Sequence, residues 1–205
     1  ICEDRDMTSD WYYVGSNKIH KTALINWDVV EMGENNIIGA YTCIGTDAQS
    51  IRDKSTGVIS IGDNNIFRES VSVNMPTEWS KLTAIEDNCY LMINSNIAHD
   101  CYVESNCIIS NNAAFGGHVY VMENTNIGYS VSIHQFQVIG SYCMLGMGSI
   151  VPKGADIKCG TLWYGVPARF KKYNEVGLQR NGLAVEDMKG EDERRQSIIE
   201  ERSKY

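Results

Sequence analysis

Residues 85–157 read IEDNCYLMINSNIAHDCYVESNCIISNNAAFGGHVYVMENTNIGYSVSIHQFQVIGSYCMLGMGSIVPKGADI. Along this stretch one apolar residue recurs at every sixth position without a slip. The series is Ile85, Leu91, Ile97, Val103, Ile109, Phe115, Val121, Ile127, Ile133, Ile139, Leu145, Val151 and Ile157. Neither a helix, with its period of 3.6 residues, nor an alternating strand, with its period of two, requires an apolar residue at every sixth position. The period indicates a chain built from repeated six-residue units.

Two further tracks accompany the apolar series. The positions four residues after it are small or β-branched, apart from Gln137. They are Cys89, Ser95, Cys101, Cys107, Ala113, Val119, Thr125, Val131, Gln137, Cys143, Ser149 and Ala155. The positions three residues after it are rich in asparagine: Asn88, Asn94, Asp100, Asn106, Asn112, His118 and Asn124. Asn, Asp and His tolerate a left-handed backbone better than other non-glycine residues, so this third track predicts corners.

The tracks together predict an all-β fold, a left-handed parallel β-helix of hexapeptide repeats with a short C-terminal α-helical tail. Each unit is one short strand and one corner, and three units form an 18-residue coil around a three-sided core. Parallel strands of successive coils then lie roughly 4.8 Å apart. The large aliphatic residue and the small residue both point inward, which explains the cysteines of the small track as packing residues.

The pattern divides the chain into three parts. Residues 1–17 are an N-terminal extension, and residues 18–159 form the β-helix. Its rhythm breaks near 46–58 and near 74–84, which predicts two loops that leave the prism; such excursions carry function about as often as they do not. Residues 160–205 form a C-terminal segment and helix, in which Glu191 and Arg195 have the spacing of an i,i+4 ion pair.

Composition excludes several classes of protein. A net charge of -8 argues against nucleic-acid binding. No apolar run is long enough to span a membrane, and no charged-then-apolar leader is visible, although the chain starts at Ile1 without Met. The placement of the cysteines on the inward track favours reduced, buried cysteines and hence a cytoplasmic protein. The cysteine count is odd and no CxxC occurs, which disfavours a disulfide framework or a zinc ribbon.

Three of the four histidines fall on one side of the predicted prism. His99, His118 and His134 belong to units whose first residues are 18 apart, and Gly117 lies 18 residues beyond His99. Singly, His118 and Asp100 are as readily explained as corner residues, and His134 as a solvated strand residue. Zinc is a competing use of the three histidines, but its ligands must lie about 2 Å from one point. His99 and His134 are two coils apart, so one subunit does not easily close all three on one metal.

Four strings carry a resemblance to a known family. They are LMINSNIAHDC (91–101), NNAAFGGHVYV (111–121), IHQFQVIG (133–140) and GLQRNG (177–182), and IGDNNIFRESVSV (61–73) also matches. Together, in this order and spacing, they closely resemble the acyl-carrier-protein-dependent UDP-N-acetylglucosamine O-acyltransferases of lipid A synthesis. The resemblance covers roughly residues 18–182. It implies a homotrimer with active sites between subunits and no bound cofactor.

The resemblance also implies roles for individual residues. His99 is the catalytic base, Asp100 its partner, and Gly117 the donor of a backbone N–H to the oxyanion. His118 contacts the sugar, and His134 and Gln135 line the acceptor and acyl-chain cleft. Asn174 and Arg180 match positions that touch the nucleotide or the phosphopantetheine arm of the donor. The basic residues Arg169, Lys171 and Lys172 belong to YGVPARFKK (164–172), which is similar to the tail of acetyl-CoA-dependent transferases; they suit CoA phosphates or an acidic carrier protein equally.

The chain departs from the family at several places. Asn96 stands where the bacterial enzymes commonly have a second histidine, in the substrate-binding region, and Val176 replaces a glutamate. The N-terminal part of the prism and the C-terminal helical region are both shorter. Met147 matches the position that measures acyl length, and its bulk predicts a short or medium acyl group. These departures favour a relative that acts on another sugar, such as a 3-amino sugar of a surface polysaccharide.

The predicted function is therefore transfer of an acyl group, from acyl-ACP or acyl-CoA, to a hydroxyl or amine of a UDP-N-acetylglucosamine-like nucleotide sugar. Histidine, which titrates near neutrality, suits the proton transfer that this attack requires. An acetyl-CoA-dependent sugar O- or N-acetyltransferase of polysaccharide synthesis is the nearest alternative. A zinc-dependent hydratase of the same fold and a β-helix that has lost activity are the others.

Overall fold

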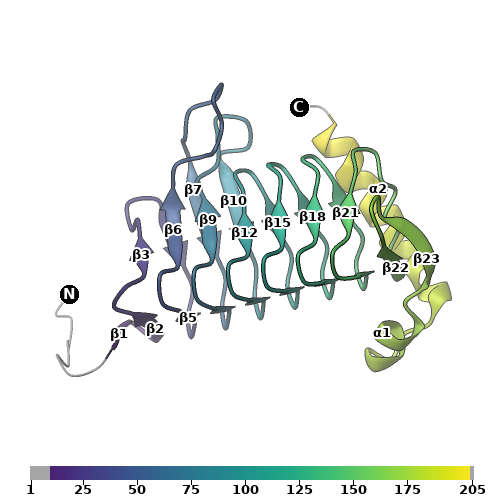
Figure 1. Cartoon of the computed structure of the whole chain (residues 1–205), viewed down its shortest axis with the longest axis horizontal. Helices are drawn as coiled ribbons and strands as arrows, with labels where there is room; N and C mark the ends of the chain where they lie inside the picture. The colour runs from purple at the N-terminus through teal and green to yellow at the C-terminus, as the bar shows by residue number, and fades with distance from the viewer. Residues whose placement is uncertain (1–9, 204–205) are drawn as a thin grey trace.

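The computed structural model describes residues 10–203, which wind into a prism with three parallel sheets (Figure 1). The predicted left-handed parallel β-helix is confirmed. Each full coil places one strand in each sheet, and strands of successive coils pair in parallel. From β10 onward the paired residues are 18 apart, as in Tyr90 with Ile108 and Tyr102 with Tyr120. Each backbone ladder therefore ties one coil to the next along its whole length.

Sheet A has ten strands, and it includes the antiparallel hairpins at the two ends of the prism. Its strands are β1 (Trp11–Val14), β2 (Asn17–His20), β5 (Ile37–Ile38), β8 (Ile66–Phe67), β11 (Tyr90–Leu91), β14 (Ile108–Ile109), β17 (Asn126–Ile127), β20 (Met144–Leu145), β22 (Thr161–Tyr164) and β23 (Arg169–Tyr173). β1 and β2 form an antiparallel hairpin, and β2 pairs with β5. Part of the segment expected as an N-terminal extension (1–17) thus joins this sheet.

The other two sheets contain only coil strands. Sheet B is β3 (Leu24–Ile25), β6 (Cys43–Thr46), β9 (Ser72–Asn74), β12 (Asn96–Ile97), β15 (Ala114–Phe115), β18 (Ser132–Ile133) and β21 (Ile150–Val151). Sheet C is β4 (Val30–Met32), β7 (Val58–Ile61), β10 (Leu82–Ile85), β13 (Tyr102–Val103), β16 (Tyr120–Val121) and β19 (Val138–Ile139).

The core consists of the two inward tracks. Every member of the apolar series from Ile85 to Ile157 is at most 3% exposed, and the small track is buried apart from half-buried Ala155. Cysteines of the small track donate weakly to carbonyl oxygens of the next coil, as Cys107 Sγ does to Met122 O at 3.3 Å. Burial raises the pKa of Cys101 to about 12, which makes it an unreactive packing residue. Cys2 lies outside the described residues.

The corners adopt the left-handed backbone that the asparagine track predicts. All seven residues of that track, from Asn88 to Asn124, have φ between 56° and 64°. The same conformation continues at Ser130, Phe136 and Tyr142, where the residue type gave no indication of it. Position in the repeat therefore fixes the backbone angle even where the side chain does not favour it.

Two long loops leave the prism at the edge between sheets B and C, in consecutive coils. Residues 47–57 join β6 to β7, and residues 75–81 join β9 to β10; both project from the prism in Figure 1. They are shorter than the breaks expected at 46–58 and 74–84, because the flanking strands continue to pair at their ends. Thr56 N donates to Pro76 O at 3.0 Å, so the loops support each other.

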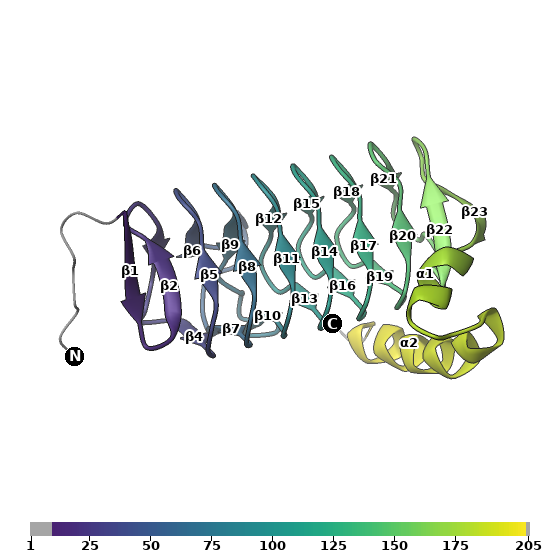
Figure 2. The ribbon, with the colours of Figure 1, turned by 90° about the horizontal axis from the view of Figure 1, so that it is seen from below.

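The C-terminal segment closes the far end of the prism and returns along it. β22 and β23 form a hairpin, followed by α1 (Glu175–Arg180), a single 3-10 turn η1 (Val185–Asp187) and α2 (Met188–Arg202). Figure 2 shows α2 running back along the coils. The expected Glu191–Arg195 pair is wrong: Arg195 bonds Asp156 of the prism at 2.7 Å, and Glu191 pairs with Arg194.

Among the described residues, no helix has the length and apolar character needed to cross a membrane.

The corner geometry predicts a contrast between two substitutions at Asn106, an exposed corner residue with φ of 61°. Asn106→Val places a β-branched side chain in the left-handed region, which costs roughly 1–2 kcal/mol. Asn106→Gly relieves that constraint and is expected to change stability little. Thermal denaturation measures both; a valine variant as stable as the glycine variant would contradict the corner assignment.

Candidate active site

The predicted site residues meet at the edge between sheets B and C. This edge is a stack of corners: His99–Asp100 follows β12, Gly117–His118 follows β15, and Gln135–Phe136 follows β18. The two long loops belong to the two preceding coils of the same edge. The winding of the chain thus brings together side chains from five successive coils.

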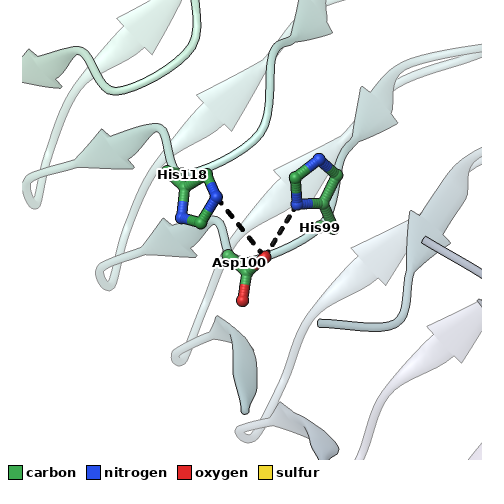
Figure 3. Close-up of side chains that lie close together, drawn as sticks. All are labelled: His99, Asp100 and His118. Carbon is green, nitrogen blue, oxygen red and sulfur yellow. Dashed lines mark hydrogen bonds and ion pairs between the residues drawn. The ribbon is translucent and has the colours of Figure 1, made fainter. Parts of the chain in front are cut away.

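His99 and Asp100 form a hydrogen-bonded pair. His99 Nδ1 lies 2.7 Å from Asp100 Oδ2, and the side chains are 12% and 0% exposed (Figure 3). An ionised carboxylate only accepts hydrogen bonds, so Nδ1 carries the hydrogen and Nε2 keeps its lone pair. His118 Nε2 lies 3.6 Å from the same oxygen. The arrangement leaves one imidazole nitrogen of His99 able to take up a proton.

Gly117 lies directly against the His99 ring. A Cβ placed on Gly117 would come within 2.4 Å of His99 Cε1 and 2.5 Å of Nε2. No side chain larger than hydrogen fits there unless the imidazole moves. Gly117 O accepts from Phe136 N at 3.0 Å, whereas within residues 10–203 nothing accepts from the Gly117 N–H. That N–H is available to a substrate.

Loop 75–81 supplies the remaining partners of the Asp100 carboxylate. Thr77 Oγ1 donates to Oδ2 at 2.8 Å, the Thr77 N–H lies 3.1 Å from Oδ1, and Ser80 Oγ lies against Oδ1. Burial alone would raise the pKa of Asp100, but the hydrogen bonds from His99, Ser80 and Thr77 outweigh it and lower the pKa below its ordinary range. Asp100 is therefore ionised at neutral pH.

His118 is buried, and its ring packs against two aromatic side chains. Its ring stacks on Phe136, with centroids 4.3 Å apart, and meets Trp79 edge-on at 6.2 Å. Burial lowers its pKa, and the neighbouring Asp100 charge only partly opposes this. Arg202 at the end of α2 donates to His118 O at 2.9 Å and to Asp100 O at 3.2 Å. The neutral imidazole is the form that this environment favours.

The next coil of the edge is exposed. His134 and Gln135 are both open to solvent, and His134 Nδ1 lies 3.0 Å from Gln135 O. The backbone of Gln135 lies over Gly116, where a Cβ would meet Gln135 N at 2.6 Å. Asn96, on sheet B beside the site, donates to Ser72 Oγ at 2.8 Å.

Other predicted site residues lie elsewhere on the same chain. Asn174 caps the N-terminus of α1 and, with Arg180, lines a groove of about 420 Å³ beside β14, β17 and β20 of sheet A. Met147, 77% exposed, follows β20 and lies at the edge between sheets A and B. The basic residues Arg169, Lys171 and Lys172 are all exposed on β23. Within a single chain, Asn174, Arg180, Met147 and the basic residues of β23 therefore do not lie beside His99.

The edge also contains a set of potential metal ligands. One ligand atom each from His99, Asp100 and His118 lies within 4.8 Å of the others, and His134 is not among them. The three-histidine set considered from the sequence is thus not assembled within one chain. Because Thr77, Ser80 and His99 already occupy the Asp100 carboxylate, the geometry favours an acid–base pair over a metal site.

Five residues of the site were not predicted from the sequence: Phe136, Thr77, Trp79, Ser80 and Arg202. Phe136 could have been found, since it lies 18 residues beyond His118 on the corner track. Thr77, Trp79 and Ser80 lie in a loop outside the repeat, so no period pointed to them. Arg202 reaches the site through the path of α2, which the sequence does not define.

The sequence and the fold both have relatives among known proteins. Residues 83–117 match the bacterial transferase hexapeptide (six repeats) family model. An acyl-[acyl-carrier-protein]–UDP-N-acetylglucosamine O-acyltransferase from Synechocystis sp. is 35% identical over 159 residues, which cover 77% of this chain and 57% of the relative. The chain thus spans little more than half the length of that relative.

Solved structures extend the match. LpxA from Acinetobacter baumannii is 30% identical, with a TM-score of 0.66, over 87% of this chain and 80% of that one. The chain belongs to the UDP-N-acetylglucosamine acyltransferase family. Its member from Bacteroides fragilis gives a TM-score of 0.79 at 29% identity, over 87% of this chain and 69% of that one. The resemblance seen in the sequence strings is confirmed.

The environment of His118 predicts a pH dependence of stability. Its folded pKa lies below the ordinary value of 6.5, so unfolding takes up a proton and stability falls as pH drops below about 6.5. His118→Asn, which suits the left-handed corner, removes this contribution. Denaturation between pH 7.5 and 5 should show the wild type losing stability relative to the variant; parallel curves would contradict the assignment.

Proposed function

We propose that this protein is an acyltransferase that moves an acyl group from a thioester donor to a hydroxyl or amine of a UDP-N-acetylglucosamine-like nucleotide sugar. One observation carries the proposal: a His99–Asp100 pair with an unpaired Gly117 N–H one coil away, in a chain of this family. Family membership supports UDP-N-acetylglucosamine itself as the acceptor.

His99 acts as the general base in this mechanism. Asp100 fixes Nδ1–H, so Nε2 removes the proton from the acceptor group as that group attacks the thioester carbonyl. The imidazolium that forms is stabilised by the ionised Asp100 and returns its proton to the departing thiolate. The acyl group passes directly from donor to acceptor, so no acyl-enzyme intermediate is required.

Gly117 stabilises the tetrahedral intermediate. Its N–H belongs to a fixed backbone corner and has no partner in the described part of the chain. A preorganised backbone donor of this kind is among the most effective ways to stabilise a developing oxyanion. His134 and Gln135, one coil further along the edge, extend the same surface toward the acceptor and the acyl chain.

The donor is proposed to be an acyl carrier protein carrying the acyl group, with acyl-CoA as the other option. Arg169, Lys171 and Lys172 form a basic strand on a chain of net charge -8, which suits the phosphates of either donor. Asn174, Arg180 and Met147 lie on other edges of the prism. We propose a cytoplasmic homotrimer in which neighbouring subunits bring these positions to His99.

The test is turnover with a defined panel of substrates. Purified protein is incubated with UDP-N-acetylglucosamine and UDP- and dTDP-amino sugars, each with acyl-ACP and acyl-CoA donors, and products are identified by mass spectrometry. His99→Ala should lose about 10²–10⁴-fold in turnover. His20→Ala, on β2 at the other end of the prism, is the matched control and should retain it. A fully active His99→Ala enzyme, or no product from any pair, would refute the proposal.

A second prediction concerns Gly117. Gly117→Ala should displace the His99 ring, because the new methyl group would lie 2.5 Å from Nε2. Turnover is expected to fall at least about 100-fold while the melting temperature changes little. Gly190→Ala, whose Cβ meets nothing within 4 Å, is the control glycine variant. Normal turnover by Gly117→Ala would exclude the proposed position of the base.

A third prediction concerns acyl length. With Met147 in place, short or medium acyl donors are expected to react best. Met147→Gly should shift the preference toward longer chains, because it removes the exposed thioether side chain from the position that measures acyl length. Competition between donors of different length measures the shift. A 14-carbon preference in the wild type, or an unchanged preference in the variant, would contradict the assignment.

A further inference from the structure

The Asp100 carboxylate receives more hydrogen bonds than a simple histidine partner requires. Besides His99, it accepts from the Thr77 hydroxyl at 2.8 Å and from the Thr77 N–H, and it meets both the hydroxyl and the N–H of Ser80. Its own backbone N–H donates to Thr83 Oγ1 at 2.9 Å. Both carboxylate oxygens are therefore fixed in direction.

The loop that supplies these donors is itself held in place. Ser55 and Thr77 form an antiparallel bridge between loops 47–57 and 75–81. Trp79 Nε1 donates to Asp53 Oδ1 at 3.2 Å, which is a second tie between the loops. Thr77 is fully buried, so its hydroxyl has no water to replace Asp100 as a partner. The loop pair is thus a rigid support for the carboxylate.

We propose that Thr77 and Ser80 are positioning residues for the catalytic pair: they hold the Asp100 carboxylate on His99 Nδ1 and so keep Nε2 free to act as the base. If Asp100 rotated away, His99 could place its hydrogen on Nε2 and could no longer accept a proton there. Side chains that orient a catalytic carboxylate in this way act on turnover without touching the substrate. This inference rests on the proposed function of His99 as a base.

The same chain provides a matched control for this arrangement. Ser105 donates to Glu86 Oε2 through its hydroxyl at 2.9 Å and through its N–H at 3.1 Å. This is the same hydroxyl-and-amide pattern on one carboxylate, but it lies at the edge between sheets C and A, away from any histidine. Ser105→Ala therefore removes an equivalent hydrogen bond with no base beside it.

The experiment compares Thr77→Val, Ser80→Ala, their double variant and Ser105→Ala. We expect kcat to fall about tenfold or more in the double variant with KM within about twofold, and Ser105→Ala to match the wild type. Thr77→Ser, which restores the hydroxyl, should recover most of the loss. Should the double variant fold poorly, the two single variants give the same comparison, each with a smaller decrease.

The tautomer of His99 provides a readout that a purely structural role would not change. In ¹⁵N-histidine-labelled protein, long-range proton–nitrogen correlation spectra should show Nδ1–H for His99 in the wild type and an increased Nε2–H fraction in the double variant. An unchanged tautomer ratio, or a kcat within twofold of wild type, would overturn the proposal. The spectra need no substrate, so they test the positioning role even if the proposed acyl transfer fails.

Discussion

The parallel ladder between successive coils is the interaction on which everything else in this molecule depends. Because each strand pairs with its counterpart in the next coil, which from β10 onward is 18 residues away, a residue's position in the repeat decides which wall or edge it occupies. Inward tracks then stack like on like, and each aliphatic layer packs on the next. The same ladder aligns His99, Gly117 and Gln135 without long-range contacts specific to the site. In this fold the relative placement of these three residues follows directly from the winding of the core.

The repeat made most of the fold readable in the sequence. Period, inward burial and left-handed corners all follow from local steric rules, so Ile85 through Ile157 could be placed by counting alone. The proximity of His99 to Gly117 followed from the same count, whereas the pairing of His99 with Asp100 was implied by the resemblance to the family. Loop boundaries were less accurate, because strand ends such as Thr46 and Val58 continue to pair beyond the point where the sequence pattern breaks.

What could not be read were contacts made by segments outside the repeat. Thr77 and Ser80 reach Asp100 because two loops pack on each other, and no periodic rule describes that packing. A C-terminal helix was expected, but its path was not. Arg194 contacts Glu104 and Arg195 contacts Asp156, although from the sequence either arginine could equally have been a solvated surface charge. The contacts of α2 depend on the position and direction in which the chain leaves the β22–β23 hairpin and α1. The sequence pattern does not determine either.

The path of α2 also has a consequence for the order in which the molecule is completed. The corner that contains His99 and His118 lies in the middle of the chain, whereas Arg202, which binds the carbonyl oxygens of Asp100 and His118, lies near the end of the described residues. During synthesis the β-helix can wind from its N-terminal coils as the ribosome delivers them. Arg202 can bind these two carbonyl oxygens only after α2 has been made and has folded back along the coils. The coils therefore position His99 and His118 before α2 fixes the backbone of their corner.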